Sequence, residues 1–130
     1  MKKKDITIML VDDDVEYGEI VVKGIQMHGY SVIYFSKGKE AINAIKDGKK
    51  YDAALIDLSL EDISGAEVIS ASKDTNPSIR VYTFTGYSIS EDDAKRLRAD
   101  WHMNKSDLST KEGRKSVFEN MDCYFRINES

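Results

Sequence analysis

The feature of this sequence that most constrains its fold is a short apolar run followed by a longer amphipathic segment, repeated five times. The apolar runs fall at residues 6–11, 31–35, 51–57, 79–84 and 101–103, and the first of them is rich in β-branched residues. Continuous apolar runs of this length are typical of strands that are buried on both faces of a parallel sheet. The sequence therefore predicts five strands, of which those at residues 6–11 and 51–57 are expected to be buried in the sheet.

Helical periodicity fills the intervals between these runs. The expected helices cover residues 15–28, 36–46, 65–76, 90–98 and 110–125. Strands that alternate with helices predict a parallel sheet covered on both faces by helices. Right-handed crossovers leave few topologies, of which the strand order 2-1-3-4-5 is the obvious candidate. We therefore predict an α/β fold, a doubly wound, flavodoxin-like (βα)5 sheet.

Length and composition indicate one domain and argue against several classes of protein. The 130 residues carry a net charge of −4, which disfavours a nucleic-acid binder, and the apolar runs are too short to cross a membrane. The basic start at residues 2–4 is followed by an apolar stretch that is too short for a signal peptide. We expect a single cytoplasmic domain over residues 1–130, with no effector domain in this chain.

The last predicted helix supplies two further expectations. Its apolar stripe is expected to consist of Val117, Met121, Tyr124 and Phe125. Cys123, the only cysteine, cannot form an internal disulfide and has no metal-ligand spacing around it. We expect Cys123 to be a partly buried, small apolar residue.

Charged and hydroxyl side chains follow the predicted strands at their carboxyl ends. In a doubly wound sheet, ligands bind at this edge. The residues placed there are Asp12, Asp13 and Asp14 after the first strand, Asp57 at the end of the third, Thr85 after the fourth and Lys105 after the fifth. The sequence therefore predicts one site that gathers these groups.

The chemistry of these groups is coherent. Carboxylates that converge within a few ångströms repel one another unless one is protonated or a cation neutralises them. A hard divalent ion with oxygen ligands, most naturally Mg²⁺, is the simple solution. Lys105 and Thr85 would suit a phosphoryl group, and Asp57 could accept that group as a nucleophile. We expect Mg²⁺ and Lys105 to offset the charge that gathers during phosphoryl transfer.

Four segments in this order resemble the receiver domains of two-component response regulators. They are residues 8–14 (IMLVDDD), 54–60 (ALIDLSL), 84–86 (FTG) and 103–105 (MNK), and the resemblance covers essentially the whole chain. It implies a switch that takes a phosphoryl group from a sensor histidine kinase or a histidine phosphotransfer protein. Apart from its own phosphorylation and dephosphorylation, such a domain is not an enzyme.

The resemblance also implies a role for each acidic residue. Asp57 corresponds to the phosphoacceptor. Asp12 and Asp13 correspond to the acidic pair that binds Mg²⁺ with Asp57, and the backbone carbonyl of Ser59 would be a further ligand. Asp14 is expected to cap the first helix rather than to bind metal.

The switch residues implied by the resemblance are Thr85, which would move to the phosphoryl group, and His102. Lys105 would pair with the phosphoryl group. In the family an aromatic residue stands three positions before the lysine, and His102 there would make the switch sensitive to pH near neutrality; a half-buried histidine without a switching role stays open. Ser106 stands where the family usually has proline, so the Lys105–Ser106 peptide is either trans or a strained cis bond.

Two further positions and one surface complete the expectations. Glu61 stands where the family commonly has proline and adds a negative group near the pocket rim. Tyr87 is expected to shield the acyl phosphate and lengthen its life. Output is expected through a downstream protein partner or an effector domain missing from this chain. The segments 90–98, 101–103 and 110–125 are the expected contact surface, and a homodimer could form through it.

The sequence argues against two other functions and leaves a third open. A haloacid-dehalogenase-type phosphatase needs a second aspartate two residues after its nucleophile, where this chain has Ser59. A flavodoxin needs a phosphate-binding loop after the first strand, where Asp12 and its neighbours would repel phosphate. A receiver fold that is never phosphorylated and acts only as an interaction module remains the alternative.

Overall fold

The computed structural model describes residues 1–86 and 89–128, so Tyr87 lies outside the described residues. Its strands are β1 (Thr7–Val11), β2 (Ser31–Phe35), β3 (Ala53–Asp57), β4 (Arg80–Thr85) and β5 (Trp101–Asn104). Its α-helices are α1 (Val15–His28), α2 (Gly38–Lys46), α3 (Gly65–Thr75), α4 (Glu91–Arg96) and α5 (Lys111–Tyr124). Two 3₁₀ turns that the sequence analysis did not foresee are η1 (Lys3–Asp5) and η2 (Lys105–Leu108).

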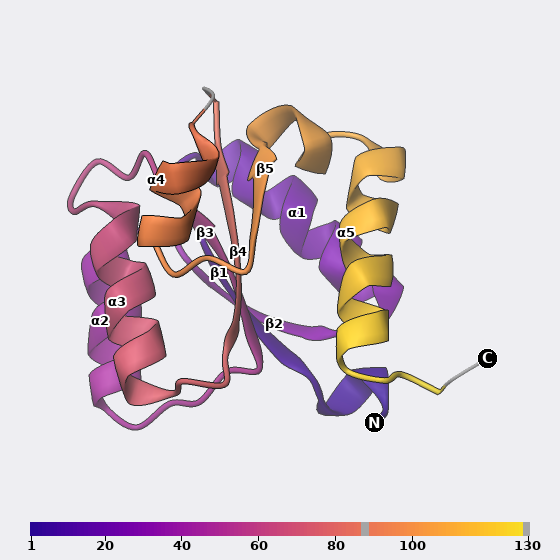
Figure 1. Ribbon diagram of the computed structural model, residues 1–130. Coiled ribbons are helices and arrows are strands. Elements are labelled where there is room, and N and C mark those ends of the chain that lie inside the picture. Colours follow the sequence, from indigo (N-terminus) through magenta and orange to yellow (C-terminus); the bar gives the residue numbers. More distant parts are fainter. Residues whose placement is uncertain (87–88, 129–130) are drawn as a thin grey trace.

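The strands form one parallel sheet in the order β2-β1-β3-β4-β5, which confirms the predicted topology. Figure 1 shows α1 and α5 on one face of the sheet, and α2, α3 and α4 on the other. The register pairs Val11 with Ile56 and Asp57 with Phe84. The strands therefore end at nearly the same level, and the residues that follow them share one edge of the sheet.

Two apolar layers hold the helices to the sheet, because side chains alternate between the faces along each strand. Leu10 and Phe84 face α1 and α5, where they pack with Ile25 and Met121. Neighbouring strand residues face α2 and α3, and this second cluster includes Met9, Val11, Ile56, Val68 and Val81. The rigid core fixes the strands, and the strand ends position the site.

Polar side chains cap four of the α-helices at their amino ends. Asp14 accepts a hydrogen bond from the Tyr17 N–H, so its predicted capping role is confirmed. Ser64, Ser90 and Thr110 cap α3, α4 and α5 in the same way. The residue before α2 is Lys37, whose side chain makes no capping bond.

Two expectations about the last helix are wrong. Cys123 is exposed, because it lies two positions beyond buried Met121, and a step of two residues along a helix points to the opposite side. Tyr124 is 46% exposed and does not join the apolar stripe. Its ring lies instead 4.5 Å from the guanidinium carbon of Arg80, which covers it from the sheet side.

Element boundaries differ from prediction by one or two residues. α2 begins at Gly38 rather than at residue 36, and β3 begins at Ala53 rather than at residue 51.

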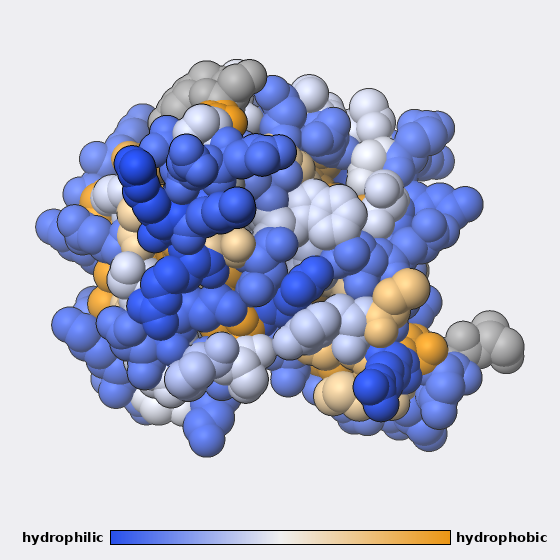
Figure 2. All heavy atoms as spheres, in the orientation of Figure 1, coloured by the Kyte–Doolittle hydropathy of each residue, from blue (hydrophilic) through white to orange (hydrophobic). Residues whose placement is uncertain are grey.

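Figure 2 shows polar residues over most of the visible face, with apolar residues in small separate patches. Among the described residues, no helix is long and apolar enough to span a membrane.

Candidate functional site

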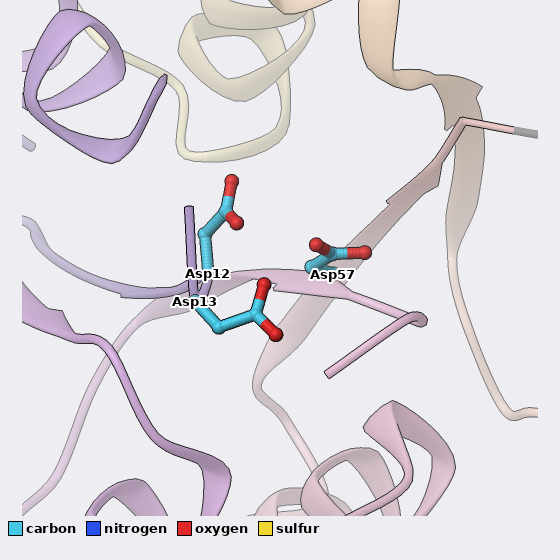
Figure 3. Close-up of side chains that lie close together, drawn as sticks. All are labelled: Asp12, Asp13 and Asp57. Atoms are coloured by element: carbon cyan, nitrogen blue, oxygen red, sulfur yellow. The ribbon is translucent and has the colours of Figure 1, made fainter. Parts of the chain in front are cut away.

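Three carboxylates converge at the carboxyl edge of the sheet. Asp12 and Asp13 follow β1, and Asp57 ends β3, the neighbouring strand. One oxygen of each carboxylate lies within 4.8 Å of the other two, and Figure 3 shows the three side chains grouped around one point. Asp12 and Asp57 are buried, whereas Asp13 is half-buried. The convergence predicted from the strand ends is confirmed.

Asp12 carries the electrostatic strain of this cluster. Its Oδ1 accepts a hydrogen bond of 2.9 Å from the Asp14 N–H, but its buried Oδ2 has no hydrogen-bond partner among residues 1–86 and 89–128. Burial, with a further contribution from the charge of Asp57, raises the pKa of Asp12 to about 6. A buried oxygen with no partner, facing two further carboxylates, fits the ligand set of a hard divalent cation.

Lys105 brings a positive charge to the same cluster. Its Nζ lies 3.4 Å from Asp12 Oδ1, 3.5 Å from Asp57 Oδ2 and 4.0 Å from Asp14 Oδ2. Burial alone would lower the pKa of Lys105, but the charges of Asp12 and Asp57 outweigh it and raise the pKa. The ammonium therefore stays charged and faces the acceptor carboxylate. The Lys105–Ser106 peptide is trans, as are all peptide bonds between described residues.

Thr85 and Ser59 line the other side of Asp57. The buried hydroxyl of Thr85 lies 3.2 Å from Ser59 Oγ, and the Ser59 N–H donates a hydrogen bond of 2.9 Å to Asp57 Oδ1. A chain of polar contacts thus connects Thr85 to Asp57 through Ser59. The sequence places Ser59 beside the acceptor, with its backbone carbonyl as an expected metal ligand, whereas the contact between its hydroxyl and Thr85 is visible only in the structure.

His102 is half-buried on β5 and pairs with β4. Its Nδ1 lies 2.9 Å from the hydroxyl of Thr83, not of Thr85. Burial lowers the pKa of His102, so the imidazole is neutral at pH 7 and titrates below its usual range. The pH at which this residue changes charge is therefore displaced away from neutrality.

Comparison with known proteins assigns the fold and the acidic pocket to one family. The family model described as the response regulator receiver domain matches residues 8–106. The chain belongs to this family. A solved receiver domain protein (CheY-like) from Methanospirillum hungatei JF-1 superimposes on 90% of this chain and 94% of its own, with a TM-score of 0.74 and 23% identity. At that identity the likeness shows the fold alone.

Two further relatives are informative about this receiver domain. The response regulator TrrA from Thermotoga maritima, solved in complex with Mg²⁺-BeF, is 25% identical, with a TM-score of 0.68 over 76% of this chain and 85% of its own. Transcriptional regulatory protein ZraR from Klebsiella oxytoca is 28% identical over 99 residues. Those residues are 76% of this chain and 22% of the regulator, so the receiver domain spans less than a quarter of that relative.

Two tyrosines support the pocket of the receiver domain, although the sequence analysis did not single them out. The Tyr34 hydroxyl donates a hydrogen bond of 2.6 Å to the backbone carbonyl of Asp12. Tyr17 lies on the first turn of α1, and its hydroxyl donates to the backbone carbonyl of Lys105. Both tyrosines fall on helical or strand patterns that predict core packing, so no local signal marked them as part of the site.

Hydrogen bonds attach the β3–α3 loop to Asp13 and to the start of α2. The Glu61 N–H donates a hydrogen bond of 2.8 Å to Asp13 Oδ2. Asp62 accepts hydrogen bonds from the Gly38 and Lys39 N–H groups, at 3.0 and 2.9 Å. Asp62 thus supplies the amino-terminal cap that Lys37 does not give to α2. Although burial opposes it, these N–H donors hold the pKa of Asp62 below its usual value.

Asp62→Ala is expected to lower the free energy of unfolding by about 1 kcal/mol, because α2 loses its cap. Asp62→Asn retains an acceptor and should lose less. The pKa of Asp62 is depressed in the folded state, so its contribution is present above the unfolded pKa and is lost as the pH falls through the folded pKa. Urea denaturation at pH 7 and at a pH well below 3.8 tests this, and an equal loss at both pH values would contradict it.

Proposed function

We propose that this receiver domain accepts a phosphoryl group on Asp57, from a sensor histidine kinase or a histidine phosphotransfer protein, in a Mg²⁺-dependent reaction. The observation that carries the proposal is the position of Lys105 Nζ, 3.5 Å from Asp57 Oδ2 and 3.4 Å from Asp12 Oδ1. A fixed ammonium beside a buried carboxylate suits a reaction that brings phosphate oxygens to that carboxylate.

The residues that would hold Mg²⁺ are Asp12, Asp13, Asp57 and the backbone carbonyl of Ser59. The converging carboxylate oxygens support this set, as does Asp12 Oδ2, which has no hydrogen-bond partner within the described part of the chain. When bound, Mg²⁺ would offset the negative charge of the phosphoryl oxygens and of the carboxylates themselves. The relative TrrA was solved with Mg²⁺-BeF, which agrees with this assignment.

The chain's own groups would perform the transfer by position and charge. An Asp57 oxygen attacks phosphorus while the bond between phosphorus and the donor's histidine nitrogen breaks, giving an acyl phosphate. The Ser59 N–H and Lys105 hold the two oxygens of Asp57 from different sides. Lys105 then pairs with the transferred group. We expect the domain to turn over no other substrate and to act as a switch rather than as an enzyme.

The switch would start at Thr85. Its hydroxyl is next to Ser59 and would turn to the phosphoryl group, which adds about two negative charges. The space that Thr85 leaves would allow His102 to turn inward and bias a pre-existing two-state equilibrium. We place the domain in the cytoplasm. Its output would pass through a protein partner, an effector region or a second copy bound to the face of α4, β5 and α5.

Intact-protein mass spectrometry after incubation with acetyl phosphate and Mg²⁺ tests the proposal. We expect the wild-type domain to gain one labile phosphoryl group and Asp57→Asn to gain none. The control is Asp47→Asn, an exposed residue at the carboxyl end of α2, which should behave as wild type. Omission of Mg²⁺ should prevent uptake. A wild-type domain that gains no phosphate would favour the alternative, an interaction module that is never phosphorylated.

A further inference from the structure

We infer that Tyr17 is a positioning residue for phosphoryl binding and that it acts through Lys105. This inference rests on the proposed function, because it assigns to Tyr17 the task of fixing the ammonium that receives the phosphoryl group. Tyr17 holds Lys105 at two points that are far apart in the lysine itself. Its hydroxyl donates to the Lys105 backbone carbonyl, and its ring lies 4.5 Å from the Lys105 Nζ.

The need for such a support follows from the chain around Lys105. Lys105 begins the turn η2 directly after β5, and Ser106 has no ring to restrict the backbone there. The local restraints are the mutual contacts of Asn104 and Asp107. The Ser106 N–H donates to Asn104 Oδ1 at 3.0 Å, and the Asn104 N–H donates to Asp107 Oδ2 at 3.2 Å. These bonds shape the turn but do not touch the lysine side chain.

The lysine side chain has several competing directions. Its Nζ lies within 4.0 Å of Asp12, Asp14 and Asp57, and its long stem would otherwise sample all three. The face of the Tyr17 ring attracts the Lys105 ammonium by a cation–π interaction. That contact restricts the ammonium to the space between Asp12 and Asp57, where a phosphoryl group on Asp57 would be bound.

Two contacts restrain Tyr17 itself. Its backbone N–H donates to Asp14 Oδ1 at 3.2 Å, and its ring centroid lies 6.0 Å from that of buried Phe84. Burial, followed by the nearby charges of Asp12 and Asp57, raises the pKa of Tyr17. The hydroxyl therefore remains protonated and continues to donate. The support links the first turn of α1 to the end of β5, two segments that only the fold brings together.

Beryllofluoride, used as a phosphoryl mimic, separates a positioning role from a merely structural one. We expect Tyr17→Phe to weaken beryllofluoride binding about 5-fold at saturating Mg²⁺, because it loses a single hydrogen bond. Tyr17→Leu also loses the ring face and should weaken binding further. Calorimetric affinity for Mg²⁺ alone should change less than about 2-fold, because Lys105 is not a metal ligand.

Two further variants make the test decisive. In a Lys105→Ala background, Tyr17→Phe should cause no additional loss, because its effect passes through the lysine. Tyr30→Phe is the matched control, since the Tyr30 hydroxyl also donates a hydrogen bond, to Asp122, far from the pocket. It should leave beryllofluoride binding unchanged even if it lowers stability.

The failures of the two proposals are distinguishable. If the wild-type domain binds Mg²⁺ and beryllofluoride but Tyr17→Phe and Tyr17→Leu bind them equally well, the inference about Tyr17 is overturned and the proposed function stands. An equal loss with and without Lys105 would also overturn it. If the wild-type domain takes up no beryllofluoride at all, the proposed function fails first, and the role of Tyr17 fails with it.

Discussion

Gly65→Ala is expected to lower the free energy of unfolding by about 3 kcal/mol, at the upper end of the cost of overpacking a buried site. A Cβ on Gly65 would lie 2.4 Å from the backbone oxygen of Asp57 and 2.7 Å from the Leu58 Cα. Both contacts are with backbone, so no side-chain rotation can relieve them. Either α3 must move away from the sheet or the end of β3 must shift.

The same change should impair phosphorylation, because the displaced backbone carries Asp57. Phosphate uptake from acetyl phosphate is therefore expected to slow, even at a temperature where the variant is fully folded. Gly86→Ala is the matched control, since a Cβ there meets no atom of the described residues within 4 Å. Its stability in urea should equal that of the wild type or exceed it slightly. If Gly65→Ala proved as stable as Gly86→Ala, the close approach of α3 to β3 would be wrong.

The parts of the site that could be predicted are those set by the strand ends. A buried strand appears in the sequence as an apolar run, and the point where the run stops is visible to within about two residues. Asp12, Asp57 and Lys105 each stand at such a point, and parallel strands bring these points to one edge. The acidic pocket and its lysine therefore follow from local patterns together with one rule of topology.

The supports of the site could not be predicted in this way. Tyr17 and Lys105 are separated by 88 positions, and Asp62 reaches back 23 and 24 positions to the start of α2. Gly65 looks in the sequence like an ordinary helix start, and only the fold shows that backbone fills the space where its side chain would be. Such contacts depend on the spacing between elements to within a few tenths of an ångström, and no periodicity in the sequence encodes that spacing.

The wrong prediction that Cys123 is buried has a different cause, because the sequence itself contains the helical pattern that indicates its exposure. The apolar positions of α5 include Val117 and Met121, one helical turn apart, and Cys123 lies off that stripe. The general tendency of cysteine to be buried predicts a buried Cys123, whereas the helical period predicts an exposed one. In an amphipathic helix the period is the stronger guide, because a displacement of two residues, about half a turn, moves a side chain from the buried stripe to the side that meets solvent.

Asp12→Asn is expected to stabilise the metal-free domain by about 2 kcal/mol at pH 7.5, an unusual direction for a change at a buried site. Burial and the charge of Asp57 raise the pKa of Asp12 from 3.8 to about 6. Because the folded state binds this proton more tightly than the unfolded state does, wild-type stability falls as the pH rises from about 4 to about 6 and stays low above that range. Asparagine has nearly the same shape and never ionises, so it avoids this loss.

The pH and Mg²⁺ dependence of this stabilisation show whether the carboxylates are held together for a cation. Below about pH 4 Asp12 is protonated in both states, so the advantage of Asp12→Asn over the wild type should vanish. Saturating Mg²⁺ should stabilise the wild type by mass action and the variant less, which narrows or reverses the order of their melting temperatures. Thermal denaturation with Mg²⁺ and with a chelator measures both effects, and Asp47→Asn should show neither. If Asp12→Asn were less stable than the wild type in the chelator, the cluster would be a stabilising hydrogen-bonded network rather than a group of carboxylates that repel one another.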